Sequence, residues 1–441
     1  MPGLTDPLLA LKHRNFRLLW SSQFVSFSGS MMQTAAILWH VSLLVPPEKK
    51  GIALGTVGLV RVLPIIAFSL IGGVVADAHD RRRLMLVTQS AMALAAAVLA
   101  AITFSGQASV WLIYLFAAIG SAAGSFDSPA RQSLVPNLVP REHLPNALSL
   151  NAIMFQVAAV LGPSLAGIVI ATLGIGWVYA LNAISFLAVI AALLRMRDVP
   201  VRAAGERGEL SLAAAREGLR FVFAAPLIRS TMLLDFFATF FASPTALLPI
   251  FAQDILHVGP QGYGWLYAAP SIGAVATGAI MVRLVDRIDR RGPVLLWSVV
   301  GFGLATIAFG LSRSFLLTFF CLALTGATDT VSMVLRNIIR QLATPDRLRG
   351  RMTSVNMIFF MGGPQLGELE AGLVAQGFGA PFSVVSGGIG CLIATGWIAW
   401  KTPAIRDYQR EELIVEPAEA ERETPVAMGA GATAGTGAGT G

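Results

Sequence analysis

Long apolar runs alternate with short polar connections through most of this chain. Runs of about 18–28 residues recur twelve times, and each is long enough to cross roughly 30 Å of hydrocarbon as a helix. They are placed at 16–44, 52–76, 84–104, 110–130, 147–173, 177–194, 228–252, 262–285, 293–311, 315–335, 352–376 and 381–400. The pattern predicts an all-α integral membrane protein with twelve transmembrane helices.

The connections between these runs alternate in charge. Those that follow the odd-numbered runs are short, and together they hold three basic residues, Lys49, Lys50 and Arg313. Nearly all other Lys and Arg residues lie on the opposite side. Because basic connections stay in the cytoplasm, both termini are expected there. The first apolar run is too long for a cleavable signal and has no small-residue cleavage site after it.

One long internal connection divides the chain into two sets of six runs. The sequence predicts an N-terminal half at 1–194, a cytoplasmic linker at 195–227 and a C-terminal half at 228–402. Ser211 is a suitable N-cap for a linker helix that lies on the membrane surface. A tether between the halves is the favoured role of the linker, with partner binding as the alternative. Residues 403–441 end in a Gly/Ala/Thr-rich stretch and are expected to be disordered.

Composition supports the membrane assignment. The chain of 441 residues is 55% hydrophobic and only 13% charged, with a mean hydropathy of +0.69, whereas soluble domains carry roughly 25% charged residues. The net charge of +7 is attributed to cytoplasmic connections rather than to nucleic-acid binding. Both cysteines lie in apolar runs, which implies no disulfide framework. Phosphate-loop and metal-binding patterns are missing, so we expect no nucleotide, no cofactor, no metal and no enzymatic activity.

A charged hairpin occurs twice. Asp-x-x-Asp-Arg-Arg stands at 77–82 and again at 286–291, each time between two apolar runs. Further matched positions follow in the same order, namely Arg131 with Arg336, Pro140 with Pro345, Ser149 with Ser354, Asn151 with Asn356, and Gly162-Pro163 with Gly363-Pro364. The ordered series predicts two similar halves. Such repeats are common in transporters, where the binding site lies between the repeats near mid-membrane.

The first hairpin carries the sequence's resemblance to a family. The major facilitator superfamily has Gly-x-x-x-Asp-x-x-Gly-x-Arg-Arg after its second span, matched here by Gly73, Asp77, Arg82 and Arg83, with Asp80 in place of the second glycine. The resemblance covers about 1–402. Within the superfamily the chain is similar to the branch of bacterial enterobactin exporters and drug and macrolide efflux proteins. The similar pieces are 126–132, 134–140, 146–148, Arg349-Gly350-Arg351 and Gly363-Pro364-x-x-Gly367.

The resemblance implies a conformational latch at the cytoplasmic surface. Asp77 would accept hydrogen bonds from free amides at the start of the eleventh span, and Arg82 or Arg83 would pair with Asp127. By symmetry, Asp286 would act against the fifth span near Ala147. The alternative is that these residues only fix topology. The full set of latch candidates is Gly73, Asp77, Arg82, Arg83, Asp127, Arg131, Asp286, Arg290, Arg291 and Arg336.

Ionisable residues within the apolar runs form the second candidate set, because a charge at membrane depth is costly. Each acid is either a proton carrier or the static partner of a buried arginine. Glu368 and Glu370 are two positions apart and should face different sides of their helix. The candidate proton or substrate residues are Arg61, Asp235, Asp329, Glu368, Glu370, Gln33, Asn151 and Asn356.

These features favour a secondary transporter in a bacterial inner membrane. Resemblance implies proton-coupled export of a small molecule, such as a siderophore, a drug or another amphipathic compound, by alternating access. One alternative is a facilitator or importer with the same fold. Another is a membrane scaffold that transports nothing. The expected partners are the substrate, protons and the lipid bilayer.

Overall fold

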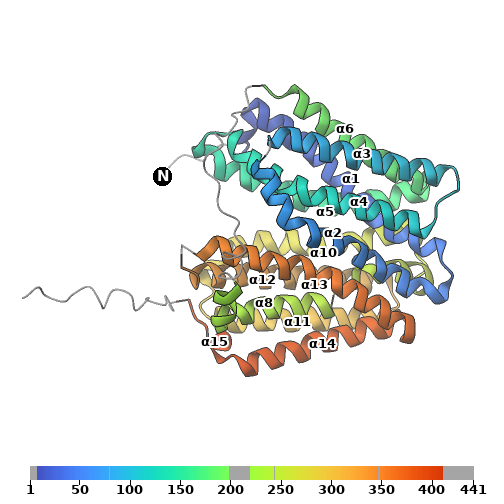
Figure 1. The fold of residues 1–441 in the computed structure, drawn as a ribbon. Helices are drawn as coiled ribbons and strands as arrows, with labels where there is room; N and C mark the ends of the chain where they lie inside the picture. The colour runs from blue at the N-terminus through green and yellow to red at the C-terminus, as the bar shows by residue number, and fades with distance from the viewer. Residues whose placement is uncertain (1–6, 79, 198–218, 243, 346–347, 411–441) are drawn as a thin grey trace, which may run out of the picture.

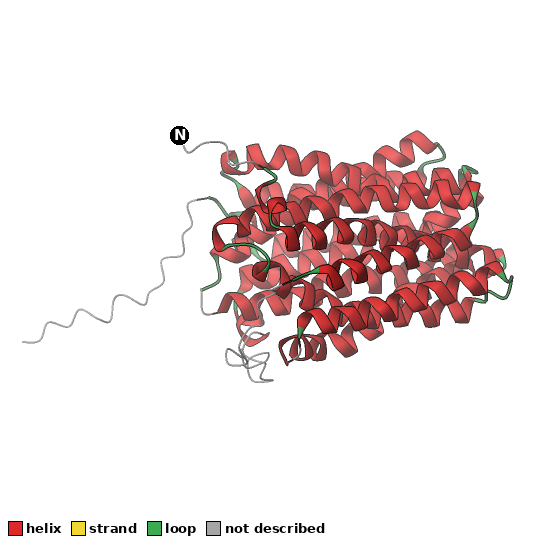
Figure 2. Cartoon of the chain, turned by 90° about the horizontal axis from the view of Figure 1, so that it is seen from above, coloured by secondary structure: helices red, strands yellow, loops and turns green. Residues whose placement is uncertain are grey.

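The computed structural model describes residues 7–78, 80–197, 219–242, 244–345 and 348–410 of the chain. Every regular element within these residues is helical (Figure 2). The N-terminal half contains α1 (Arg14–Leu44), α2 (Lys50–Ala78), α3 (Arg81–Phe104), α4 (Val110–Leu134), α5 (Leu144–Thr172) and α6 (Ile175–Arg195). The C-terminal half contains α8 (Pro226–Phe241), α9 (Leu248–Ile250), α10 (Gly259–Leu284), α11 (Arg291–Leu311), α12 (Phe315–Leu342), α13 (Arg349–Phe378), α14 (Ala380–Lys401) and α15 (Pro403–Arg406).

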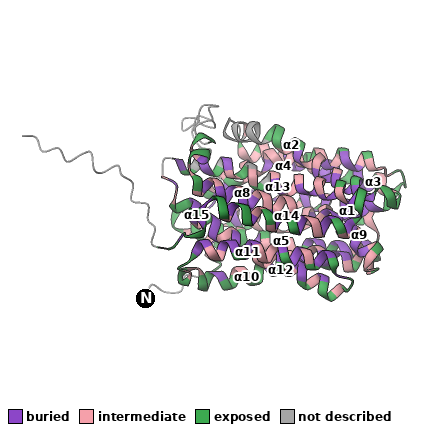
Figure 3. Cartoon of the chain, turned by 90° about the horizontal axis from the view of Figure 1, so that it is seen from below, coloured by how far each residue is buried: buried purple, intermediate pink, exposed green. Residues whose placement is uncertain are grey.

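The predicted twelve-span fold is confirmed. Within the described residues, ten helices are long and apolar enough to cross a membrane, and α1 and α13 complete the twelve. These two helices carry more polar side chains, Gln23 and Gln33 on α1 and Glu368 and Glu370 on α13. Large apolar side chains such as Trp111, Val282 and Trp400 are exposed. Figure 3 shows exposed residues along the helices of the bundle. This surface is what a lipid bilayer would cover.

Helix packing repeats between the halves, as the ordered sequence matches predicted. In the N-terminal half the main pairs are α1–α5, α1–α6, α2–α4, α3–α4 and α3–α6. The C-terminal half has the same pairs at equivalent positions, α8–α13, α8–α14, α10–α12, α11–α12 and α11–α14. Two further pairs join the halves, α2–α13 and α5–α10, and these are also equivalent to each other (Figure 1).

The seventh span differs from the prediction because it is broken. α8 ends at Phe241, a 3-10 turn η5 covers Pro244–Leu247, and α9 follows before the π-helix η6 at Phe251–Ile255. Pro244 and Pro249 each lack the backbone N–H that a continuous helix requires. The predicted connection between the runs 228–252 and 262–285 therefore begins within a π-helix.

The segment after α14 also differs from the prediction. Residues 403–410 were expected to be disordered, but Ile405 and Tyr408 are buried against α11. The Gly292 amide donates to the Tyr408 carbonyl over 3.0 Å, and the Arg410 amide donates to the Asp289 carbonyl over 2.8 Å. The polar composition of this segment suggested that it could not compensate for the entropy lost on ordering. The two buried side chains and these backbone hydrogen bonds offset that loss. Residues 411–441 and 198–218, which include most of the linker, lie outside the described residues.

The two ends of the bundle differ in composition. One end carries the starts of α1, α3 and α5 and both charged hairpins, and we call it the charged end. There the Arg14 guanidinium donates to the Arg195 carbonyl over 3.1 Å, and Ser230 bonds to Thr402 over 2.8 Å. The other end carries the short, weakly basic connections, and we call it the short-loop end.

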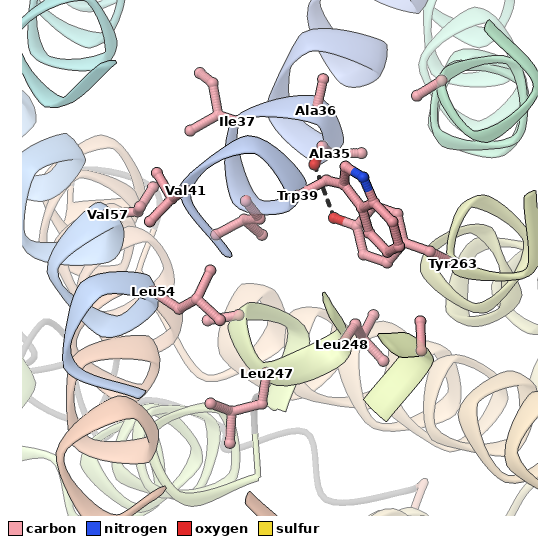
Figure 4. Packing of buried hydrophobic residues seen from close by; sticks show 14 of the residues in the cluster. Ala35, Ala36, Ile37, Trp39, Val41, Leu54, Val57, Leu247, Leu248 and Tyr263 are labelled. Atoms are coloured by element: carbon pink, nitrogen blue, oxygen red, sulfur yellow. Dashed lines mark hydrogen bonds between the residues drawn. The ribbon is translucent and has the colours of Figure 1, made fainter. Parts of the chain in front are cut away.

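Among the described residues, the hydrophobic core that the halves share lies at the short-loop end. One buried cluster there contains Val41, Leu54 and Val57 from α1 and α2 together with Leu247 and Tyr263 from the C-terminal half (Figure 4). The buried clusters at the charged end each belong to one half, one around Phe16 and Leu193 and others around Leu335 and Met352. The apolar packing between the halves is therefore concentrated at the short-loop end.

Glycines allow the two inter-half helix pairs to pack backbone against backbone. A Cβ added at Gly372 of α13 would lie 2.6 Å from the Gly55 Cα of α2. A Cβ added at Gly167 of α5 would lie 3.0 Å from the Gly264 Cα of α10. Small residues at such contacts bring helices together in membranes, where dispersion contacts and interhelical hydrogen bonds replace the hydrophobic effect.

Candidate functional site

A buried arginine on α12 gathers two of the predicted acids. Arg336 is 1% exposed, and its Nη2 lies 2.8 Å from Asp235 Oδ1 on α8 and 3.4 Å from Asp329 Oδ1 on α12. Its Nη1 donates to Ser332 Oγ over 2.6 Å, whereas Nε is buried without a hydrogen-bond partner. Arg336, which the sequence repeat grouped with the latch, thus lies with two acids from the proton or substrate set. We call these four residues the C-half arginine site.

The two acids of this site differ in exposure. The Asp235 side chain is 3% exposed, whereas that of Asp329 is 42% exposed. A buried ion pair holds both partners because removal of either leaves an uncompensated charge in a low-dielectric interior. Asp235 therefore neutralises Arg336, and Asp329 is a second carboxylate that the protein encloses less completely.

A second arginine extends this polar region toward the charged end. Arg340 is buried, and it donates to Asn337 over 2.6 Å and to Asn356 on α13. The predicted substrate residue Asn356 therefore serves as an interhelical contact between α12 and α13 in this structure.

The residue of the N-terminal half that is equivalent to Arg336 is Arg131 on α4. Arg131 lies 3.8 Å from Asp127 one turn away, and its guanidinium carbon lies 4.2 Å from the centre of the Phe27 ring on α1. Asp127 also accepts from Thr88 over 2.9 Å and from Gln89 over 3.0 Å, both on α3. We call Arg131, Asp127 and Phe27 the N-half arginine site.

Glu368 lies at the contact between α2 and α13. Its side chain is 7% exposed, and its Oε2 has no hydrogen-bond partner. A Cβ added at Gly58 of α2 would lie 2.9 Å from that oxygen, so the carboxylate packs directly on the α2 backbone. Arg61, one turn further along α2, attracts it electrostatically and itself donates to Thr34 over 2.8 Å. An acid from one half is thus buried against the other half.

The remaining members of the proton or substrate set lie apart from these clusters. Glu370 borders an apolar groove of about 430 Å³ between α8 and α13, lined by Phe240, Leu366, Leu369, Leu373 and Val374. It faces a different side of α13 from Glu368, as their spacing predicted. Gln33 accepts a hydrogen bond from Asn182 over 2.7 Å, which joins α1 to α6. Asn151 is half-buried on α5.

The latch residues are only partly described. Gly73 and the Asp77 side chain are not among the described positions, and the predicted contact of Asp77 with the start of α13 lies outside them as well. Arg82 donates to the Leu194 carbonyl over 3.3 Å, and Arg83 is exposed. Among the described interactions, Asp127 pairs with Arg131 rather than with Arg82 or Arg83.

The second hairpin makes contacts within its own half. The Asp286 side chain is exposed, and the Asp286 carbonyl accepts from Arg410. Arg290 is exposed, whereas Arg291 is 7% exposed at the start of α11. The contacts described for this hairpin therefore involve the segment after α14, and the predicted approach of Asp286 to α5 is not among them.

A set of polar contacts between the halves was missed from the sequence. Lys50, at the start of α2, donates to both carboxylate oxygens of Asp254 at 2.9 Å and to Gln253 Oε1 at 2.9 Å. Gln376 of α13 donates to the Glu48 carbonyl and accepts from the Ile52 amide over 3.1 Å. The only available signal was a lysine on the side of the protein that is poor in basic residues. Within the described residues, no group of three or more His, Cys, Asp or Glu could hold a metal.

Solved structures with the same architecture are membrane transporters. A bacterial homolog of the human lysosomal transporter Spinster, in an inward-facing and unoccupied conformation, aligns with a TM-score of 0.70 at 15% identity, covering 90% of this chain and 98% of that one. A bacterial homologue of the iron transporter ferroportin, in an inward-facing state, aligns with a TM-score of 0.64 at 17% identity, covering 88% and 98%. This chain thus has the fold of these structures, a multi-pass helical bundle with two six-helix halves.

Sequence comparison defines the family within that class. The family model described as "Transmembrane secretion effector" matches residues 5–428. The enterobactin exporter EntS of Citrobacter koseri is 28% identical over 345 residues, which are 78% of this chain and 81% of that protein. EntS of Shigella boydii is 26% identical over 382 residues, 86% and 90% of the two chains. The chain belongs to the transmembrane secretion effector family of the major facilitator superfamily, in the branch that contains the enterobactin exporters.

Proposed function

We propose that this protein exports a small amphipathic molecule across the bacterial inner membrane by alternating access, coupled to proton entry. The observation that carries the proposal is the asymmetry of the inter-half packing. The halves share a core and backbone-close glycine contacts at the short-loop end, whereas the buried clusters formed by the described residues of the charged end each belong to one half. Two rigid halves joined at one end of their interface can rock about a central site.

The orientation of the protein in the membrane is inferred from the distribution of its basic residues. The charged end holds most Arg and Lys residues and is assigned to the cytoplasm by the positive-inside rule, with both termini on that side. The structure then corresponds to a state closed on the outside. Two structurally similar transporters are also in inward-facing states.

Export is supported by the names of the relatives, which are enterobactin exporters. Enterobactin exporters handle a siderophore, and a siderophore or a compound of similar amphipathic character is therefore the substrate class to test first. The mostly apolar span surfaces suit a substrate with an apolar body, while Arg61 and the C-half arginine site supply charged groups near the centre.

Proton coupling is assigned to Glu368. It lies at the α2–α13 contact between the two halves, and one of its carboxylate oxygens has no hydrogen-bond partner there. An acid in this position exchanges protons with water when the contact opens and is enclosed when it closes. Asp235 is the static partner of Arg336 at 2.8 Å, which favours a structural role for that acid.

The test is proton movement in inverted membrane vesicles that carry this protein. An acid-inside gradient is imposed, and siderophores, macrolides and lipophilic cations are added one at a time. A substrate should discharge the gradient, and Glu368→Gln should abolish the discharge while Glu370→Gln, the matched neighbour on the other face of α13, retains it. Accumulation or exchange of a compound without proton movement would favour a facilitator or importer. Neither proton movement nor flux with any compound would favour a scaffold.

A further inference from the structure

The polar contacts at the short-loop end form a hydrogen-bonded network that joins the two halves. Lys50 is 7% exposed, and its ammonium donates to three acceptors, the two oxygens of Asp254 and Gln253 Oε1, each at 2.9 Å. Lys50 belongs to the N-terminal half, and both acceptors belong to the C-terminal half. An ammonium has three N–H donors, so this geometry can satisfy all of them across the interface.

Two neighbouring contacts extend the connection to other helices. Gln253 Nε2 donates to Ser42 Oγ at the end of α1 over 2.7 Å. Gln376 Oε1 accepts from the amide of Ile52, in the first turn of α2, where helical amides have no partner within their own helix. Side chains of the C-terminal half thus satisfy groups of α1 and α2 that would need water if the halves parted.

The acceptors on the C-terminal half lie on an irregular piece of backbone. Gln253 and Asp254 are in the π-helix η6, and His257 just after it has a positive φ of 51° although it is not glycine. π-Helical segments occur frequently at functional sites, and a left-handed residue of this type has a conformational cost. Asp254 therefore contacts Lys50 from an irregular backbone segment between the short helix α9 and the long helix α10.

We infer that Lys50, Gln253, Asp254 and Gln376 form a gate on the outer side of the transport pathway, in which the Lys50–Asp254 pair holds the short-loop end closed. The gate must break before substrate leaves, because every contact in it crosses between the halves. This inference rests on the proposed alternating access. Lys50 and Asp254 are positioning residues that act on the equilibrium between states and do not contact the substrate.

The experiment measures access to the buried core behind the gate. Ala246 is fully buried in the shared core and lies on η5, which packs against α2 and α13. A cysteine at this position, in a background with Cys321 and Cys391 replaced by alanine, is treated in intact cells with a membrane-impermeant maleimide. Ser105→Cys, in the exposed turn after α3 at the same end, reports orientation.

K50A and D254N should each raise the labelling rate of Ala246→Cys by about tenfold, as expected for the loss of a charge-assisted hydrogen bond. K49A is the matched control, because Lys49 is exposed and no described contact joins it to Asp254. It should leave the rate unchanged. The double variant K50D/D254K restores the pair with reversed charge and should bring the labelling rate back toward that of the parent. Such a rescue distinguishes a gate from a general loss of stability.

Equal labelling of the parent and K50A, or failure of the charge reversal to restore slow labelling in a protein that still folds and inserts, would overturn the gate. Failure of the proposed orientation gives a different result, because Ser105→Cys would then resist the external reagent in every background. Failure of alternating access would appear as labelling of Ala246→Cys that rises in K50A while transport is absent from parent and variant alike.

Discussion

The two arginine sites show how one scaffold carries two different arrangements. Arg131 and Arg336 occupy equivalent positions on α4 and α12 and are related by the sequence repeat. Arg131 faces an aromatic ring, Phe27, from the first helix of its half. Arg336 faces a carboxylate, Asp235, from the first helix of its half, with Asp329 as a second acid. The position equivalent to Asp127 is Ser332.

This difference moves the negative charge from the helix that carries the arginine to a neighbouring helix. In the N-terminal half, Asp127 and Arg131 are one turn apart on α4, and α1 contributes a ring face. In the C-terminal half the principal ion pair joins α12 to α8. A pair within one helix stabilises that helix locally, whereas a pair between helices couples their positions. In the C-terminal half, the principal ion pair therefore couples the positions of two helices.

The largest expected difference between the two sites is in the loss of stability when each arginine is removed. Arg336→Met leaves Asp235 buried without its cation, and we expect a loss of about 3–5 kcal/mol in the free energy of unfolding, together with loss of transport. Arg131→Met leaves Asp127 with its hydrogen bonds from Thr88 and Gln89, so the loss should be about 1–2 kcal/mol. Unfolding of the purified proteins in detergent, followed by tryptophan fluorescence, measures both. Equal losses would show that the two sites are energetically equivalent.

The two acids around Arg336 should separate stability from transport. Asp235→Asn removes the buried partner and should cost about 2–4 kcal/mol. Asp329→Asn removes a carboxylate with a 42% exposed side chain while Asp235 remains, and should cost less than about 1 kcal/mol. Thermal melting and substrate efflux are measured on the same preparations. A larger destabilisation by Asp329→Asn would contradict the assignment of Asp235 as the main partner.

The smallest expected effect is at the aromatic face. Phe27→Leu keeps an apolar side chain beside Arg131 but removes the cation–π contact, with an expected loss of about 0.5–2 kcal/mol. Phe27→Trp retains a ring face and should recover part of that loss if the larger ring fits. Detergent unfolding of the two variants against the parent provides the measurement. A leucine variant as stable as the parent would leave the ring without an energetic role.

Sequence alone predicted the fold because span length and repeat spacing are properties of single segments. Twelve runs and the ordered matches from Asp77 to Gly363 were enough to define two halves of six helices. The break after Phe241 was missed because Pro244 and Pro249 fall in an apolar run whose length still fits one span. The buried tail segment was missed because Ile405 and Tyr408 are only two apolar residues in a polar stretch.

The candidate sites were harder to predict because they depend on which side chains meet. The acids at depth were all identified, since a charge within an apolar run is visible without a structure. The pairing of Asp235 with Arg336, 101 positions apart in the sequence, requires the packing of α8 on α12. Lys50 and Asp254 were missed because each lies at the end of a span, where a charged residue is ordinarily solvated.

The most direct test of alternating access is the distance between the halves at both ends of the bundle. Spin labels at Ser105 and Arg313 report the short-loop end, and labels at Gln132 and Leu342 report the charged end, all exposed positions. Double electron–electron resonance is recorded in lipid nanodiscs at different pH values, with and without a compound that discharges the proton gradient. Alternating access predicts that the distance at the short-loop end lengthens while the distance at the charged end shortens under the same change of pH or on addition of the same compound. Two distances that stay fixed, or that change in the same direction, would contradict it.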